Sequence, residues 1–267
     1  MSNGISVAAG ITRAAQAVGV NAIPAAGVIG AWWSSGTALA LYWIEGALVI
    51  GLMAARIALH RRWTRKAGHG HAAQFKARSR RGRHATPRAG SFLGSYLLVA
   101  IPFTLAHGLF LGLLLFMIAQ NRPDLGVVVE AGALRTGAIA MLAFLAVGFA
   151  ADLAFLAQQP FRWIERLTER SLGRVVVMHL VIIFGVMGLA LTDSPMWLIG
   201  GFAGLKALVE LGAFLPEKEL GPQPPAWLRW MNRLPAKDGE TFDTYWRRTE
   251  ASERSRREAN ERVLGAA

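Results

Sequence analysis

Seven ionisable residues lie within long apolar segments of the sequence or near their ends, where a charged side chain is costly. In membrane helices such residues usually face other helices or a polar cavity, and they mark ion paths, proton relays and ligand sites. Their types would suit proton transfer, binding of a small polar solute, or metal coordination. They are Glu45, His107, Asp152, Arg174, His179, Lys206 and Glu210.

Glu45 lies about 14 Å into its predicted helix at 1.5 Å per residue, close to the middle of a bilayer. A carboxyl at that depth must be neutral, paired with a cation, or bound to a metal. Lys206 is equally deep in a later segment, and Glu210 follows one turn further on the same face. These residues either form a salt bridge that locks two helices together or belong to a functional site.

His107 lies in the segment FTLAHGLFLG, where Gly108 and Gly112 are spaced for close approach of another helix. Its imidazole can hydrogen-bond a neighbouring helix or contribute to a polar site, and both readings stay open. His179 lies about two turns into its own segment.

Arg174 and Asp152 lie close to segment ends. Arg174 is expected to extend its side chain to the headgroup level, or to bind an anionic headgroup. Asp152 is expected to face Arg174 or Arg162.

Four of the candidates have the side chains of a carboxylate and imidazole metal site: Glu45, His107, His179 and Glu210. They come from four segments, and no two are spaced as in di-iron helix bundles. Metal binding is therefore a weak alternative, and the cofactor stays unknown. The chain has no cysteine, which excludes disulfides, thiolate ligands and cysteine nucleophiles.

The elements that must position these residues are apolar blocks of about twenty residues or more, the length that spans a bilayer. With a mean hydropathy of +0.34 and 53% hydrophobic residues, the pattern predicts an all-α, polytopic transmembrane bundle over residues 1–215. A cytoplasmic or interfacial amphipathic tail is expected over 216–267. About six spanning helices are predicted, at 14–33, 37–60, 91–119, 134–157, 172–191 and 196–215. Asn21 and Pro24 interrupt the first.

The net charge of +12 lies mostly between the apolar blocks and in the tail. The connections after the second and fourth segments are rich in arginine, whereas those after the first, third and fifth are short and nearly uncharged. By the positive-inside rule this alternation places both termini in the cytoplasm. We expect a multi-pass protein of a prokaryotic cytoplasmic (inner) membrane.

The basic loop over residues 61–90 contains ten arginines and lysines and no acid. It is expected to meet anionic lipid headgroups, as is the tail with its Trp227 and Trp230, and a nucleic-acid partner is not expected. The histidines in and beside this loop are expected in a flexible, solvated segment: His60, His69, His71 and His84.

Several segments, in this order, resemble the domain of unknown function 6498 family, a set of prokaryotic multi-pass membrane proteins. They are NAIPAAGVIGAWW, ALYWIEGALVIG, AHGLF, GRVVVMHLVIIFG and GLKALVELGAF. The resemblance covers residues 21–217 and leaves out the basic loop and the tail. It implies no activity, but it draws attention to Glu45, His107, Arg174, His179, Lys206 and Glu210.

Two positions depart from the family pattern. Val99 stands where the family often has a second histidine, two turns before the one that matches His107, and Glu210 stands where it commonly has aspartate. A metal site that needs the extra imidazole would be incomplete in this chain.

Three functions fit these observations. The first is binding or transport of a small solute, a proton or a lipid headgroup by a buried polar site. The second is a structural accessory subunit or assembly factor with a membrane protein partner. The third, and the least favoured, is an intramembrane metal-dependent enzyme.

Overall fold

The computed structural model describes residues 32–72, 90–173 and 241–265, with isolated positions between 19 and 30 and at 224 and 231. Across these ranges the chain is helical, without strands, and an isolated antiparallel bridge joins Lys66 to Val263. The predicted helix at 196–215, all but the first two residues of the one at 172–191, and most of the one at 14–33 lie outside the described residues.

Three long helices are apolar enough to cross a membrane, and they confirm the predicted all-α class: α2 (Ser35–Thr64), α3 (Phe92–Asn121) and α4 (Ala131–Leu156). A helix of 30 residues is about 45 Å long, enough for the hydrocarbon core and both headgroup layers. The chain is thus a membrane-embedded protein with three candidate spans among its described residues.

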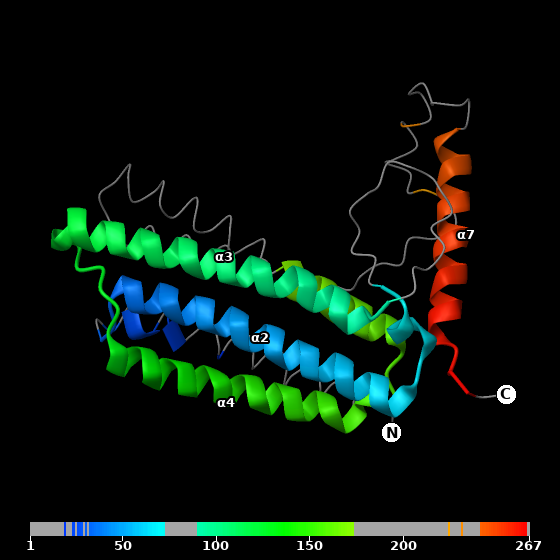
Figure 1. Cartoon of the computed structure of the whole chain (residues 1–267), viewed down its shortest axis with the longest axis horizontal. Coiled ribbons are helices and arrows are strands. Elements are labelled where there is room, and N and C mark those ends of the chain that lie inside the picture. The colour runs from blue at the N-terminus through cyan, green and yellow to red at the C-terminus, as the bar shows by residue number, and fades with distance from the viewer. Residues whose placement is uncertain are drawn as a thin grey trace.

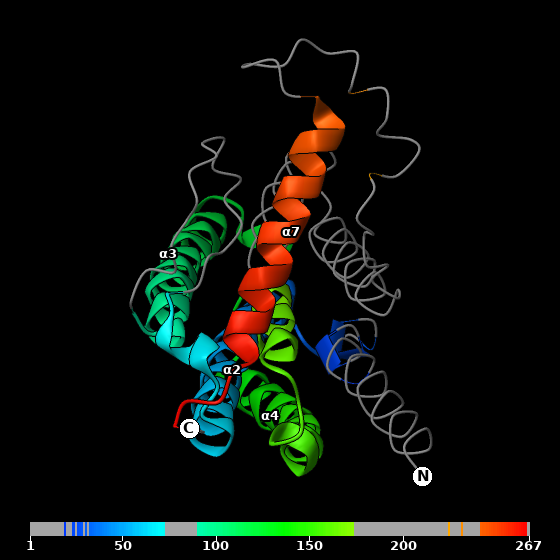
Figure 2. The same ribbon diagram turned by 90° about the vertical axis from the view of Figure 1, so that its right-hand side faces the viewer.

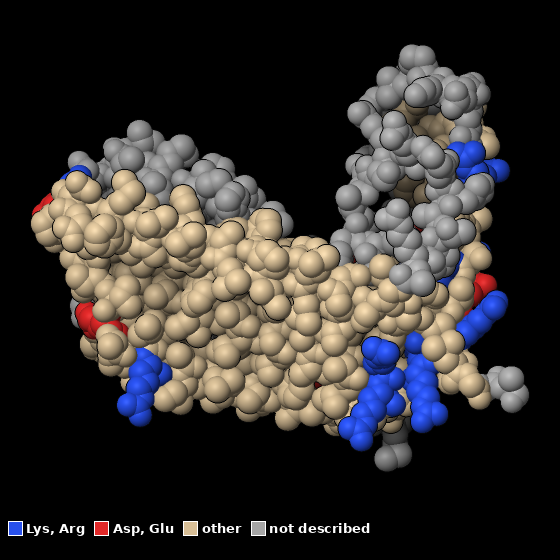
Figure 3. Space-filling view, viewed as in Figure 1, with Lys and Arg blue, Asp and Glu red and all other residues tan. Residues whose placement is uncertain are grey.

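Helix α2 lies between α3 and α4 and packs against both (Figure 1). Helix α3 runs antiparallel to α2 and helix α4 runs parallel to it, and the turn η2 (Pro123–Leu125) lies in the connection between α3 and α4. We call the end with residues 34–37 and 121–131 the outer end, and the end with residues 60–72, 90–96 and 156–173 the basic end. On the face seen in Figure 3, Lys and Arg gather at the two ends and are absent from the middle.

Side-chain caps define where the helices begin. Ser34 accepts a hydrogen bond from the backbone N–H of Thr37, and Ser91 accepts one from Gly94, so each satisfies a donor that the first turn leaves free. At the outer end Gly36 lies against the backbone of Val128, where a Cβ would stand 2.5 Å from the carbonyl oxygen. Glycine therefore permits close contact between α2 and the α3–α4 connection.

Helix α2 continues to Thr64, four residues beyond its predicted end, so the start of the predicted basic loop is helical. Arg61 and Arg62 occupy its last turn, where positive charge is favourable beside the negative end of the helix dipole. Arg65 then ends the helix in the left-handed conformation, with φ of 50°.

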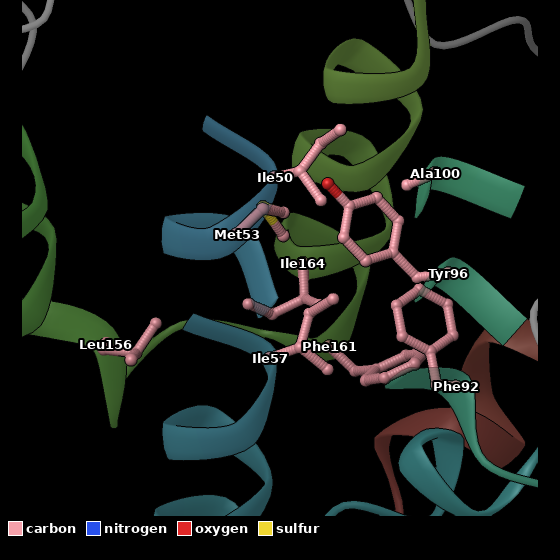
Figure 4. Packing of buried hydrophobic residues seen from close by; sticks show 9 residues of the cluster. All are labelled: Ile50, Met53, Ile57, Phe92, Tyr96, Ala100, Leu156, Phe161 and Ile164. Carbon is pink, nitrogen blue, oxygen red and sulfur yellow. The ribbon is translucent and has the colours of Figure 1, made fainter. Parts of the chain in front are cut away.

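An apolar cluster holds the helices together near the basic end (Figure 4). Residues from α2, α3 and the helical segment 161–173 converge there, so the connector after α4 packs as part of the bundle. The buried members are Ile50, Met53, Ile57, Phe92, Tyr96, Ala100, Leu156, Phe161 and Ile164.

The C-terminal helix α7 (Phe242–Glu261) begins at a Thr241 cap and lies across the basic end in a direction different from the long helices (Figures 1 and 2). It contacts the short helix η1 (Ala67–Gly70). The sequence predicted an amphipathic tail here; the described end of the tail forms this helix, in which Asn260 is buried. The last turns of the tail are thus docked on the bundle.

Candidate functional site

Glu45 and His107 are buried in the middle third of α2 and α3. Their exposed fractions are 3% and 7%. Both helices are apolar over this stretch, so each side chain is an ionisable group within the hydrophobic part of the bundle. This is where the sequence placed them.

Trp43 aligns the two helices at this level. Its indole Nε1–H donates to the Thr104 carbonyl over 3.0 Å, and its ring lies against Gly108, where a Cβ would approach it to 2.6 Å. From the Trp43–Thr104 contact, the 1.5 Å rise per residue separates Glu45 and His107 by about 8 Å in depth. They are neighbours along the bundle axis. The other glycine of the predicted close-approach pair, Gly112, has nothing within 4 Å of a Cβ.

The protonation of His107 is partly set by its own helix. Its Nδ1 lies 2.7 Å from the Phe103 carbonyl oxygen, an acceptor only, so Nδ1 carries the proton. The Phe103 ring stacks on the imidazole, with ring centroids 4.7 Å apart. Nε2 is therefore the ring atom that can accept or release a proton toward other groups.

Pro102 lies in the same part of α3, five residues before His107. Proline has no N–H, so the Leu98 carbonyl, four residues earlier, loses its usual helical donor. A backbone carbonyl freed by proline inside a membrane helix is tolerated where the helix kinks or where a neighbouring group or a polar cavity satisfies it.

A second intramembrane polar contact lies nearer the basic end. Arg56 Nε donates to Asp152 Oδ2 over 2.9 Å, with both side chains mostly buried, and the guanidinium lies 4.9 Å from the centroid of the Phe149 ring. Asp152 was expected to face Arg174 or Arg162; it pairs with Arg56 because α2 lies directly beside α4. The sequence reasoning missed Arg56, although an arginine within an apolar segment was the available signal.

Two hydroxyls near this pair also hydrogen-bond. Tyr96 Oη and Ser171 Oγ are 2.9 Å apart and buried, and they join α3 to the segment 161–173. Together with the ion pair they make polar contacts between four helical elements near the basic end.

The prediction of flexible, solvated histidines is wrong for His60 and His69. Both are buried, at 0% and 3% exposure, and His60 Nδ1 lies 2.8 Å from His69 Nε2. His60 Nε2 lies 3.0 Å from the Gln159 carbonyl oxygen and therefore donates to it. They are buried because α2 runs on past His60 and η1 packs His69 against Phe161. His84 lies outside the described residues.

Burial also changes the charge of His69. Burial first, and nearby positive charge second, lower the pKa of His69 from 6.5 to about 3, so the ring is neutral at pH 7. His71, the third histidine, is partly exposed and contacts Asn260 Oδ1 over 3.0 Å.

The end of α7 is held by charged contacts. Glu261 accepts from Lys66 Nζ over 2.6 Å and from the backbone N–H of Arg162 over 3.1 Å. Its carboxylate thus lies at the start of the helical segment 161–173, where the helix dipole favours negative charge. Burial alone would raise the pKa of Glu261, but these hydrogen bonds bring it below its usual value. Arg256 Nη1 donates to Glu165 over 2.9 Å.

Of the six predicted site residues, the structure describes Glu45 and His107. Arg174, His179, Lys206 and Glu210 lie outside the described residues. Within the described part of the chain, no three or more His, Asp or Glu side chains are placed to hold a metal ion. The two described candidates therefore define what we call the central polar site: Glu45 and His107, with Trp43, Phe103 and Thr104 around them.

Residues 6–226 match the model of DUF6498, a family of unknown function. No curated protein and no solved structure matches the chain.

Proposed function

Because the chain belongs to the DUF6498 family, whose function is unknown, we propose its function from its own residues: it binds or transports a small polar solute, a proton or a lipid headgroup at the central polar site. The observation that carries this proposal is the burial of Glu45 and His107 in the middle third of two adjacent apolar helices. Ionisable groups in that setting are rare and usually functional.

The chemistry of the two side chains supports binding or proton transfer. A histidine whose Nδ1–H is held by the Phe103 carbonyl keeps its tautomer and presents Nε2 for exchange of a proton. A carboxyl about 8 Å away in depth is within reach of a solute or a water chain that joins both groups. Arg174, His179, Lys206 and Glu210 are proposed to complete the site.

The polar contacts at the basic end do not carry the same proposal. Arg56 is paired with Asp152, and the His60–His69 pair ends on a backbone carbonyl. These pairs lie near or beyond the ends of the apolar segments, where polar groups are better tolerated, and they fix the positions of helices.

The first test is native mass spectrometry of the purified protein in mild detergent. We expect wild-type protein to retain a small polar molecule or a lipid, and Glu45→Gln to lose it. Glu130→Gln is the matched control, because Glu130 is an exposed carboxylate at the outer end and its removal should leave the retained mass unchanged.

The second test is proton flux into proteoliposomes that contain a pH-sensitive dye. Wild-type protein should acidify the lumen faster than protein-free vesicles, and Glu45→Gln and His107→Gln should each reduce the rate about tenfold or more, the size expected of a group that transfers the proton. Protein with neither a retained molecule nor a flux above that of protein-free vesicles would contradict the proposal.

We also propose that the protein spans a prokaryotic cytoplasmic membrane six times, with the basic end and both termini in the cytoplasm. The basic end carries Arg61, Arg62 and Arg65, and the contact of α7 with η1 supports a tail on the same side. Because the chain has no cysteine, single cysteines can report on topology without background.

In intact cells a membrane-impermeant maleimide should label Asp124→Cys at the outer end and Ser194→Cys in the predicted fifth connection. It should label Arg254→Cys on α7 only after the membrane is opened. Labelling of Arg254→Cys in intact cells would reverse the proposed orientation, and protection of Ser194→Cys would contradict six spans.

A further inference from the structure

The basic end carries basic, aromatic and aliphatic side chains that emerge together at the level where α2 leaves the apolar part of the bundle. They come from the end of α2 and from the last described residues of the tail, and we call them the collar: Arg61, Arg62, Trp63, Arg65, Val263 and Leu264.

The tail is joined to α2 through the backbone. The Leu264 N–H donates to the Arg65 carbonyl over 2.9 Å, and the Ala67 N–H donates to the Arg262 carbonyl over 2.8 Å. Together with the bridge between Lys66 and Val263, these bonds fix the tail beside the last turn of α2. The exposed aliphatic side chains of the tail therefore have a defined place next to the arginines.

The exposure of these apolar side chains is large. Trp63, Val263 and Leu264 are 46%, 50% and 59% exposed. The apolar run of α2 ends at Leu59, so about 20 residues at 1.5 Å per residue place the collar just beyond the hydrocarbon core. Tryptophan and arginine are enriched at that level of a membrane.

The charge of the collar is not cancelled by the acid nearest to it in the tail. Glu261 is held by Lys66 and by the start of the segment 161–173. The collar therefore offers three exposed arginines, whose planar guanidinium groups bind phosphate oxygens in pairs.

We propose that the collar binds anionic phospholipids of the adjoining leaflet, with the arginines on the phosphates and with Trp63, Val263 and Leu264 against the glycerol and upper acyl chains. The partner is a membrane lipid rather than free phosphate, because the apolar members would have no role in binding a free ion. The site is separate from the central polar site and does not depend on it.

The test is native mass spectrometry of the full-length protein in detergent, titrated with phosphatidylglycerol or phosphatidylcholine. We expect wild-type protein to retain phosphatidylglycerol in preference to phosphatidylcholine. Arg61→Gln/Arg62→Gln/Arg65→Gln should weaken retention of phosphatidylglycerol on the order of 100-fold, at about fivefold per arginine. The corresponding triple lysine variant should keep most of the preference, which shows that the loss does not come from misfolding.

Two further variants locate the effect. Val263→Ser/Leu264→Ser should lower retention of both lipids by a similar factor, because it removes apolar contact and no charge. Arg247→Gln/Arg254→Gln removes exposed charge from α7 outside the collar and should change little.

Three results would overturn the proposal. One is equal retention of phosphatidylglycerol by the wild type and the triple glutamine variant. Another is an equal loss in Arg247→Gln/Arg254→Gln, which would indicate a general effect of charge. The third is displacement of the lipid by millimolar inorganic phosphate, which would assign the arginines to a free anion. Glu45→Gln should keep the preference for phosphatidylglycerol over phosphatidylcholine, because it leaves the collar intact. Failure of the collar proposal and failure of the central polar site therefore give different results.

Discussion

In the centre of the bundle α2 and α3 meet through Gly108 and through Trp43, whose indole donates to the Thr104 carbonyl, whereas at the basic end several buried polar groups form a network. There His60, His69 and the tail residues are joined by hydrogen bonds and ion pairs. Water and lipid headgroups can hydrogen-bond polar groups at the end of a bundle, whereas the hydrocarbon around its centre cannot. Buried polar groups at the basic end therefore hold structure, and the buried ionisable groups described in the centre are the better candidates for the central polar site.

The largest loss of stability is expected when the ion pair between Arg56 and Asp152 is broken. Asp152→Ala should lower the free energy of unfolding by about 3–5 kcal/mol, because it leaves a buried guanidinium without its carboxylate. Thermal unfolding in detergent measures this. The double variant Arg56→Met/Asp152→Leu should recover most of the loss; if it is as unstable as Asp152→Ala, charge pairing is not the cause.

The contact between α2 and α3 can be broken without changing any charge. Gly108→Ala places a methyl group against the Trp43 ring and should cost about 1–3 kcal/mol by overpacking. Gly112→Ala is the matched control, one turn further along the same helix with nothing within 4 Å of its Cβ, and should be neutral or slightly stabilising. Equal unfolding temperatures for the two variants would mean that the helices do not pack closely at Gly108.

Acid should weaken the basic end. The unfolded chain protonates His69 near pH 6.5, but in the folded protein burial delays this to about pH 3. The folded state therefore loses stability as the pH falls through this window, by at most about 1.4 kcal/mol per pH unit. Unfolding of wild type and His69→Gln between pH 7 and 4.5 measures the effect, and the variant should show the shallower fall. Parallel profiles would assign the acid sensitivity to other groups.

The smallest effect is expected at the docked tail. Glu261→Gln weakens the contact with Lys66 and the negative charge at the start of the segment 161–173, which should cost about 0.5–1 kcal/mol. Limited proteolysis should then remove the tail several times faster than in wild type. Glu258→Gln, an exposed carboxylate on the same helix, should leave the rate unchanged, and equal rates for both variants would contradict docking through Glu261.

Several features could be predicted because they depend on local composition. Long apolar runs specify helices of membrane-spanning length, and α2, α3 and α4 agree with their predicted bounds to within a few residues. The family resemblance was also confirmed, over residues 6–226. Glu45 and His107, which the sequence singled out as ionisable residues within apolar runs, are both buried.

Features that depend on which helix lies beside which could not be read from the chain. Arg56 and Asp152 are 96 residues apart, and only the packing of α2 against α4 makes them partners. His60 and His69 resembled loop residues because arginines surround them in the sequence, yet segments far along the chain, Phe161 and the Gln159 carbonyl, cover them. Hydropathy determined that these helices enter the membrane, because transfer from water depends on each segment alone. The rotation and order of the helices decide which polar groups pair. They depend on contacts between segments, and only the tertiary structure set them.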